Sequence, residues 1–215
     1  MARSNPWGEN WHNENYSSAE MDTLLAQVFG PKCAFMGFEP AGRRKWVRTR
    51  KDGVMEVIAL HSDRGFIFYA GFGLSFPWIP HGDWKQVRWH RTPKSAVMDL
   101  GYESAGKVDW SIPKGRTLAS DRAKIVSTEL CESCEPWFAA MGDERRVLEE
   151  LERLRNAPHF YEFVQQLTVY LFWQARARGQ QEFDARYERQ LRSYFGDAGF
   201  LEVKYMVEKE ATRFR

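Results

Sequence analysis

Three tryptophans, two histidines and an aspartate lie within one proline-rich stretch, residues 77–93. An imidazole beside a carboxylate could act in general acid–base chemistry, and flat indole rings could stack on a sugar or a base. His81 and Asp83 are two residues apart, so an extended backbone places them on the same side. The candidate ligand pocket consists of Trp78, His81, Asp83, Trp84, Trp89 and His90. In the alternative interpretation these tryptophans only cover the end of a sheet, because tryptophan is mostly buried wherever it occurs.

A second candidate lies in residues 40–51, which contain six Lys or Arg side chains and no acid. If this stretch is a strand, alternate residues point the same way. The resulting basic face consists of Arg44, Trp46, Arg48 and Arg50, which could grip phosphates and stack a base. The alternative is an edge strand whose charges deter aggregation. The chain as a whole has a net charge of only +2, less than is typical of nucleic-acid-binding proteins, so the signal is local.

The three cysteines, Cys33, Cys131 and Cys134, do not predict a metal or redox site. A structural zinc site needs four ligands, and no second Cys or His pair stands at a suitable spacing. Glu132 and Glu135 flank the second and third cysteines and would raise the pKa of a thiol there, which works against a redox pair. Such a sparse, odd set argues against a disulfide framework and indicates a reducing cytoplasm.

Gly71 and Gly73 lie two residues apart in an apolar, strand-like run. They do not form a phosphate-binding loop, because no third glycine follows and no helix N-terminus is placed to receive a phosphate. We expect them to allow close packing of a helix. No other motif predicts a cofactor.

A helix is expected to open the folded region. Ser17 and Glu20 form a capping box. The apolar residues that follow have helical spacing and define one face: Met21, Leu24, Leu25, Val28 and Phe29. Gly30 and Pro31 predict the end of the helix, or of its first segment.

Strands follow the helix. We expect strands at 44–50 and 54–61, joined by a turn at Asp52 and Gly53, a third at 66–76, and a fourth at 97–102. The third carries its large apolar residues at a period of two, on one face: Phe66, Phe68, Ala70, Phe72, Leu74 and Phe76. This face is predicted to pack against the opening helix.

From Ser120 onward the pattern becomes helical, with breaks at Gly142, Pro158, Gly179 and Gly196. Helices are expected near 120–141, 143–155, 159–178, 181–195 and 199–211. The predicted fold class is α+β, with an N-terminal helix on an antiparallel sheet of about four strands and a mostly helical C-terminal half. The predicted organisation is an arm over 1–16, a sheet domain over 17–115 and a helical region over 116–215.

The segment Met36-Gly-Phe-Glu-Pro-Ala-Gly-Arg-Arg44, between the opening helix and the first long strand, carries a resemblance. Residues 20 to about 76 resemble a family of bacterial domains of unknown function, number four-three-oh-four. The family has no catalytic set to carry over. Some such domains occur in bacterial conflict or immunity neighbourhoods, so the resemblance implies a bacterial protein with a binding role.

The absence of a recognisable reactive constellation favours a non-catalytic protein that binds another protein, as an immunity-type or regulatory factor. One alternative is a small-ligand binder or enzyme that uses residues 77–93. The other is nucleic-acid binding through the basic strand at 43–51. No apolar run approaches the length of a membrane span, so no membrane partner is expected. The sequence does not specify an oligomeric state.

Overall fold

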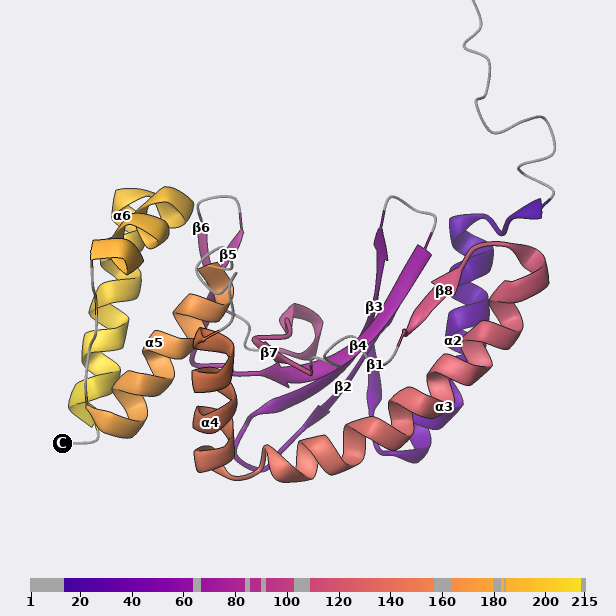
Figure 1. Ribbon diagram of the computed structural model, residues 1–215, viewed down its shortest axis with the longest axis horizontal. Coiled ribbons are helices and arrows are strands. Elements are labelled where there is room, and N and C mark those ends of the chain that lie inside the picture. The colour runs from indigo at the N-terminus through magenta and orange to yellow at the C-terminus, as the bar shows by residue number, and fades with distance from the viewer. Residues whose placement is uncertain are drawn as a thin grey trace, which may run out of the picture. The chain divides into compact units, whose positions relative to one another are not determined.

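The computed structural model describes residues 14–63, 67–83, 86–89, 92–102, 109–156, 164–179, 183 and 185–213 (Figure 1). The chain forms two compact units that are interleaved in sequence. Unit 1 consists of residues 1–48, 57–72 and 102–136, and unit 2 of residues 49–56, 73–101 and 137–215. The boundary predicted after residue 115 lies inside a segment of unit 1, and most of the predicted arm lies outside the described residues.

The opening helix, α2 (Ser18–Phe35), begins as its capping box predicts. The Ser17 hydroxyl accepts a hydrogen bond from the Glu20 amide at 3.2 Å, and the Glu20 carboxylate accepts one from the Ser17 amide at 2.7 Å. Two backbone donors that the helix leaves unpaired are thereby satisfied. One face of α2 is buried, formed by Met21, Leu25, Phe29 and Cys33.

The predicted end of this helix at Pro31 is wrong, because α2 continues to Phe35. Pro31 cannot donate a backbone hydrogen bond within the helix. The helix tolerates this loss because its buried face continues for another turn after Pro31. The helix ends at Gly37, whose φ of 81° is a left-handed conformation that favours glycine. The Gly37 amide bonds to the Ala34 carbonyl and the Phe38 amide to the Cys33 carbonyl, both at 2.9 Å. This pair of bonds is a Schellman motif.

A second long helix, α3 (Arg116–Ala140), begins near the start of α2 and runs beside it in unit 1 (Figure 1). Three side-chain contacts join residues that are 96 positions apart: Ser18 with Lys114, Glu20 with Arg116, and Lys32 with Thr128. Because the spacing is constant over more than three turns, the two helices run in the same direction and in register.

The main sheet is antiparallel and has six strands, where the sequence predicts about four. The strand order is β1-β2-β3-β4-β7, with β8 also pairing with β4. The strands are β1 (Glu39–Gly42), β2 (Lys45–Thr49), β3 (Met55–Asp63), β4 (Ile67–Ser75), β7 (Leu100–Gly101) and β8 (Ser111–Pro113). Three of them have four residues or fewer, too short for a period of two to be visible in the sequence.

Strand β4 has the predicted alternation. Its even-numbered large side chains, and Phe76 after it, are buried, whereas Ile67 and Tyr69 on the other face are exposed. In unit 1 the Phe72 ring stacks on Tyr102, with ring centroids 4.8 Å apart, and lies 5.5 Å from Trp110. The aromatic face of the strand is therefore internal, and its central ring packs against other aromatic rings.

Gly73 of β4 lies where a neighbouring strand leaves no room for a side chain. A Cβ at this position would overlap the Leu100 carbonyl oxygen of β7 and come within 2.9 Å of the Gly101 Cα. The close approach expected of a helix is thus made by strand β7, which pairs Gly73 with Gly101.

Unit 2 contains a two-stranded sheet within residues 77–93, where the sequence predicts only a long loop. Strands β5 (Pro80–Asp83) and β6 (Gln86–Trp89) pair antiparallel. The same unit holds the short helix η1 (Pro93–Ser95) and the helices α4 (Glu144–Arg155), α5 (Val164–Arg178) and α6 (Ala185–Arg213). Gly196, with a φ of 73°, interrupts α6 and separates two helical stretches as predicted.

Candidate functional site

The predicted ligand pocket is not gathered on one face by the residues that the structure describes. Trp84 and His90, and the side chain of Asp83, lie outside the described part. In the β5–β6 pair, His81 lies opposite Arg88 and Pro80 lies opposite Trp89. Because successive side chains of a strand point to opposite faces, His81 and Trp89 project from opposite sides of the hairpin.

The predicted basic face is turned towards α2 in unit 1. Arg44 forms an ion pair with Asp22 of α2 at 2.5 Å. Trp46 is only 4% exposed, and its ring stacks near Phe29 of α2 with centroids 6.0 Å apart. A buried indole cannot stack on a base, so this part of the face does not form the nucleic-acid surface expected from the sequence.

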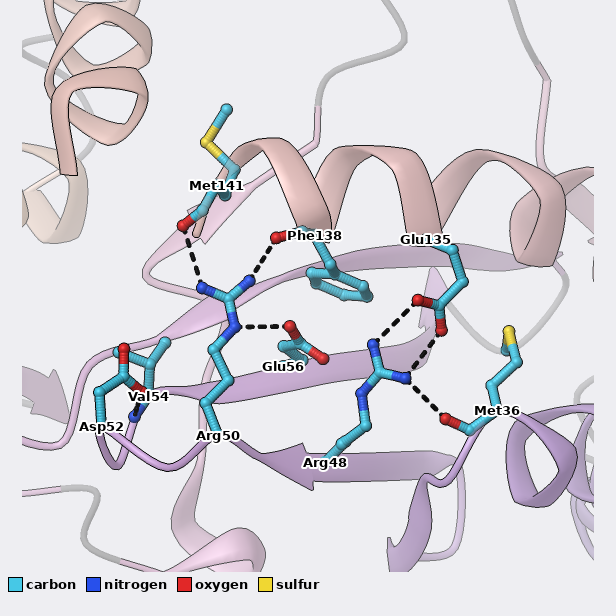
Figure 2. A network of polar contacts seen from close by, with 9 residues as sticks. All are labelled: Met36, Arg48, Arg50, Asp52, Val54, Glu56, Glu135, Phe138 and Met141. Atoms are coloured by element: carbon cyan, nitrogen blue, oxygen red, sulfur yellow. Dashed lines mark hydrogen bonds and ion pairs between the residues drawn. The ribbon is translucent and has the colours of Figure 1, made fainter. Parts of the chain in front are cut away.

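Arg48, the next residue of the predicted basic face, caps the C-terminal end of α2 (Figure 2). Its guanidinium donates to the Met36 carbonyl at 2.6 Å and makes a bidentate contact with the Glu135 carboxylate at 2.8 and 3.1 Å. It also lies 4.5 Å from the Phe38 ring centroid. A cation is favoured at this position because the last carbonyls of a helix carry partial negative charge.

Arg50, in unit 2, caps the C-terminal end of α3 (Figure 2). Its guanidinium donates to the Phe138 carbonyl at 2.6 Å and to the Met141 carbonyl at 3.0 Å, and it pairs with the buried Glu56 carboxylate at 2.6 Å. The two arginines thus bind helix ends. The alternate spacing of Arg48 and Arg50, which predicts a phosphate-binding face, instead places one arginine at the end of each helix.

An apolar groove lies between α2 and α3 in unit 1. Its volume is about 440 Å³, and it is lined by Pro31, Lys32, Phe35, Met36, Thr128, Cys131 and Glu132. Phe35 is 94% exposed, far more than the other large apolar side chains in the described residues. The groove is not foreseen from the sequence, because Pro31 predicts the end of the opening helix and leaves Phe35 outside any predicted face.

The charged side chains considered beside the groove are two carboxylates, Glu129 and Glu132, and one ammonium group, Lys32. Glu132 lines the groove and Glu129 lies one turn earlier on α3, and neither carboxylate pairs with a described residue. The Lys32 ammonium donates to the Thr128 hydroxyl at 2.5 Å. The Arg48 guanidinium offsets the partial negative charge at the C-terminal end of α2.

The cysteines of unit 1 lie near one another, but the thiols are poor nucleophiles. Burial, reinforced by the neighbouring thiols, raises the pKa of Cys33 and of Cys134 to about 12. Burial also raises the pKa of Cys131, with further contributions from Glu135 and Glu132. At neutral pH the thiols are protonated. Among the described residues, no group of three or more potential ligands has the geometry to hold a metal ion.

Unit 2 contains a small cavity of about 80 Å³. It is lined by Arg50, Asp52, Val54, Phe76, Trp78, Met141, Gly142, Glu144, Val147, Trp173 and Arg176. The Trp78 and Trp173 rings meet edge to face with centroids 6.2 Å apart, and the Arg176 guanidinium lies 4.5 Å from the Trp78 centroid. The cavity therefore combines one residue of each predicted site, Trp78 and Arg50, with helical residues that no sequence motif marks.

Comparisons of this chain with protein-family models, with curated proteins and with solved structures found no match. The resemblance of residues 20–76 to a bacterial domain family therefore stays a prediction. None of the described helices has an apolar stretch long enough to cross a lipid bilayer.

Proposed function

We propose that this chain is a non-catalytic protein-binding module, of regulatory or immunity type, and that it binds its partner through the groove between α2 and α3. The observation that carries the proposal is the 94% exposure of Phe35 at the edge of an apolar cavity. A large aromatic side chain in water forgoes about 2 kcal/mol of burial free energy. Contiguous exposed apolar surface on soluble proteins marks interaction sites.

Neighbouring residues extend this surface along α3. Ile125 and Leu118 are both exposed and lie seven residues apart, so they share one face of the helix. They add exposed apolar surface to the face of α3 that also carries Glu132 of the groove lining. Separate apolar positions along one helix suit a protein segment, which buries several side chains at once, better than a small molecule.

The charges indicate what kind of segment binds. Glu129 and Glu132 lack pairing partners among the described residues, and these two carboxylates outnumber the single ammonium group of the groove lining, Lys32. The partner is therefore a segment that inserts a large apolar side chain into the groove and carries Lys or Arg beside it. The basic residues would steer the encounter and set the register, and the apolar anchor would supply most of the affinity.

A random-peptide display library selected on the full chain tests this proposal. We expect enriched peptides to share a large apolar residue next to Lys or Arg. A synthetic enriched peptide should then bind by calorimetry, and Phe35→Ser should weaken its binding by about 2 kcal/mol, roughly thirty-fold in Kd. Glu132→Gln should weaken binding only a few-fold and make it less sensitive to salt.

Leu201→Ser is the matched control, because Leu201 is also exposed but lies on α6 in unit 2. It should leave the affinity unchanged. Enrichment without a shared motif, or binding that Phe35→Ser does not alter, would refute the proposal. So would sedimentation showing a dimer of this chain that Phe35→Ser dissociates, because the groove would then be occupied by a second copy.

A further inference from the structure

Exposed apolar side chains recur along α3 at a regular spacing. Leu118 is 62% exposed and Ile125 is 48% exposed, and the two lie seven residues apart on one face of the helix. Another step of seven residues along this face reaches Glu132, which lines the groove together with Phe35. Leu118 and Ile125 therefore lie on a face of α3 that leads to the groove.

The register of α2 and α3 gives the level of Phe35 along this surface. Three side-chain contacts join residues that are 96 positions apart along the chain, at both ends of the helix pair (Figure 1). This constant offset puts Phe35 level with Cys131, which also lines the groove. At ~1.5 Å of rise per residue, Leu118, Ile125 and Phe35 therefore lie at successive levels about 10 and 9 Å apart along the helix axes.

This spacing selects the conformation of the partner segment. In an α-helix, residues seven apart share a face and lie ~10.5 Å apart along the axis, which matches the three levels. In an extended strand, side chains on one face repeat every ~6.8 Å, so side chains ~10 Å apart project from opposite faces. A helix that runs along α3 can therefore direct one apolar side chain to each level, whereas a strand cannot.

The charges differ between the two ends of this surface. In the part of α3 before Ile125, Lys124 forms an ion pair with Asp121 at 3.3 Å. After Ile125 come Glu129 and Glu132, and among the described residues no ion pair joins either carboxylate. The Lys or Arg residues of the partner are therefore expected near the end that reaches the groove.

We infer that the partner segment is an amphipathic α-helix of about four turns, which lies along α3 and places a large apolar side chain in the groove at its basic end. This inference rests on the proposed function and adds the conformation and length of the segment. The length follows from the levels of Leu118 and Phe35, which are ~20 Å apart. Amphipathic helices bind apolar grooves in this way, with anchors three, four and seven residues apart.

Two designed peptides of about 18 residues test the conformation, because a helix of that length spans ~27 Å. Both contain the same numbers of leucine and lysine residues, with leucine at heptad spacing in one and at alternate positions in the other. We expect the heptad peptide to bind the full chain about ten-fold more tightly by calorimetry. The ¹³Cα chemical shifts of the labelled heptad peptide, bound to the unlabelled chain, should be those of a helix.

Variants of the chain test the length and the position of the helix. Phe35→Ser should weaken binding of the heptad peptide about thirty-fold, and Leu118→Ser about five-fold, because the helix reaches both levels. If Leu118→Ser does not fold, Ile125→Ser makes the same comparison. Leu201→Ser is the matched control, because Leu201 is exposed on α6 in unit 2, and it should leave the affinity unchanged.

The outcomes separate this inference from the proposed function. Tighter binding of the alternating peptide, lost in Phe35→Ser, would overturn the helical conformation and leave the proposed function in place. Binding of the heptad peptide that depends on Phe35 but not on Leu118 or Ile125 would overturn the path along α3. If neither peptide binds in a manner that depends on Phe35, the inference is overturned, and the random-peptide selection then decides the proposed function separately.

Discussion

The groove of unit 1 and the cavity of unit 2 depart from the usual distribution of side chains in opposite directions. In the groove, Phe35 leaves a large apolar surface in water. In the cavity, Trp173 keeps a polar N–H away from water and from any described acceptor. The first is relieved by covering a surface, which needs a protein segment. The second is a local cost of burial, which the packing around the indole must offset.

The units also use arginine differently, which allows the comparison to be tested by folding measurements. Arg48 in unit 1 pairs with Glu135, which is 42% exposed, whereas Arg50 in unit 2 pairs with Glu56, which is 5% exposed. Both also cap helix ends. We therefore expect replacement of the capping arginine to lower the free energy of unfolding strongly in unit 2 and only slightly in unit 1.

The largest effect is expected for Arg50→Ala. It removes the Arg50 guanidinium from the buried Glu56 carboxylate and removes two hydrogen bonds to carbonyls at the end of α3. The free energy of unfolding should fall by about 3–5 kcal/mol. Arg48→Ala should lower it by only about 1 kcal/mol, because its carboxylate partner stays hydrated. Urea denaturation of both variants measures the difference, and equal losses would contradict the contrast between the units.

A smaller effect is expected for Gly73→Ala, which places a methyl group against the backbone of β7. The strands must separate to admit it, so the loss in urea denaturation should be about 1–3 kcal/mol. Gly30→Ala in α2 is the matched control, since nothing lies within 4 Å of a Cβ there. It should stabilise the protein by about 0.5–1 kcal/mol. A Gly73→Ala variant as stable as the parent would show that β7 does not hold β4 closely.

A smaller loss of folding stability is expected in acid, and it should arise at the N-terminal end of α2. The Arg116 guanidinium, together with hydrogen bonds from Ser17, lowers the pKa of Glu20 from 4.5 to about 2. A carboxyl with a depressed pKa in the folded state stabilises the fold above its ordinary pKa, and that contribution disappears as the pH falls from 4.5 towards 2. The stability difference between the parent and Glu20→Gln should shrink across this range. A difference independent of pH would mean that the ionised carboxylate does not contribute.

The smallest effect on folding is expected for Phe35→Ser, although it should have the largest effect on partner binding. Phe35 is exposed and follows the last buried residue of α2, so the free energy of unfolding should change by no more than about 0.5 kcal/mol. Thermal unfolding and urea denaturation measure this. A loss of about 2 kcal/mol or more would assign Phe35 a role in the fold instead of in recognition.

Local features of the fold could be predicted from the sequence. The capping box at Ser17, the alternation around Phe72 and the break at Gly196 depend on neighbouring residues, and all three are present in the structure. The end of α2 could not be placed, because Pro31 is a strong stop signal that was overridden by burial of the next turn. Short strands such as β8 are recognised only through their partners.

The candidate sites depend on long-range contacts that periodicity does not reveal. The alternation of Arg48 and Arg50 is plain in the sequence, but their partners Glu135 and Phe138 lie almost ninety residues later. A strand with alternating basic residues predicts a solvent-facing surface, because the helix ends that these residues contact cannot be found from the local sequence. Trp78 stands out in the sequence, whereas Trp173 lies within an apolar helix that gives no local sign of a cavity.

The most direct test of the protein-binding function is photo-cross-linking in cells from a photoreactive amino acid placed at position 35, compared with position 201. We expect position 35 to form one discrete adduct. Mass spectrometry should map the cross-linked partner peptide to an apolar residue beside Lys or Arg, and position 201 should not form that adduct. Identical adducts at both positions, or no adduct at position 35, would contradict the claim that Phe35 marks the binding surface.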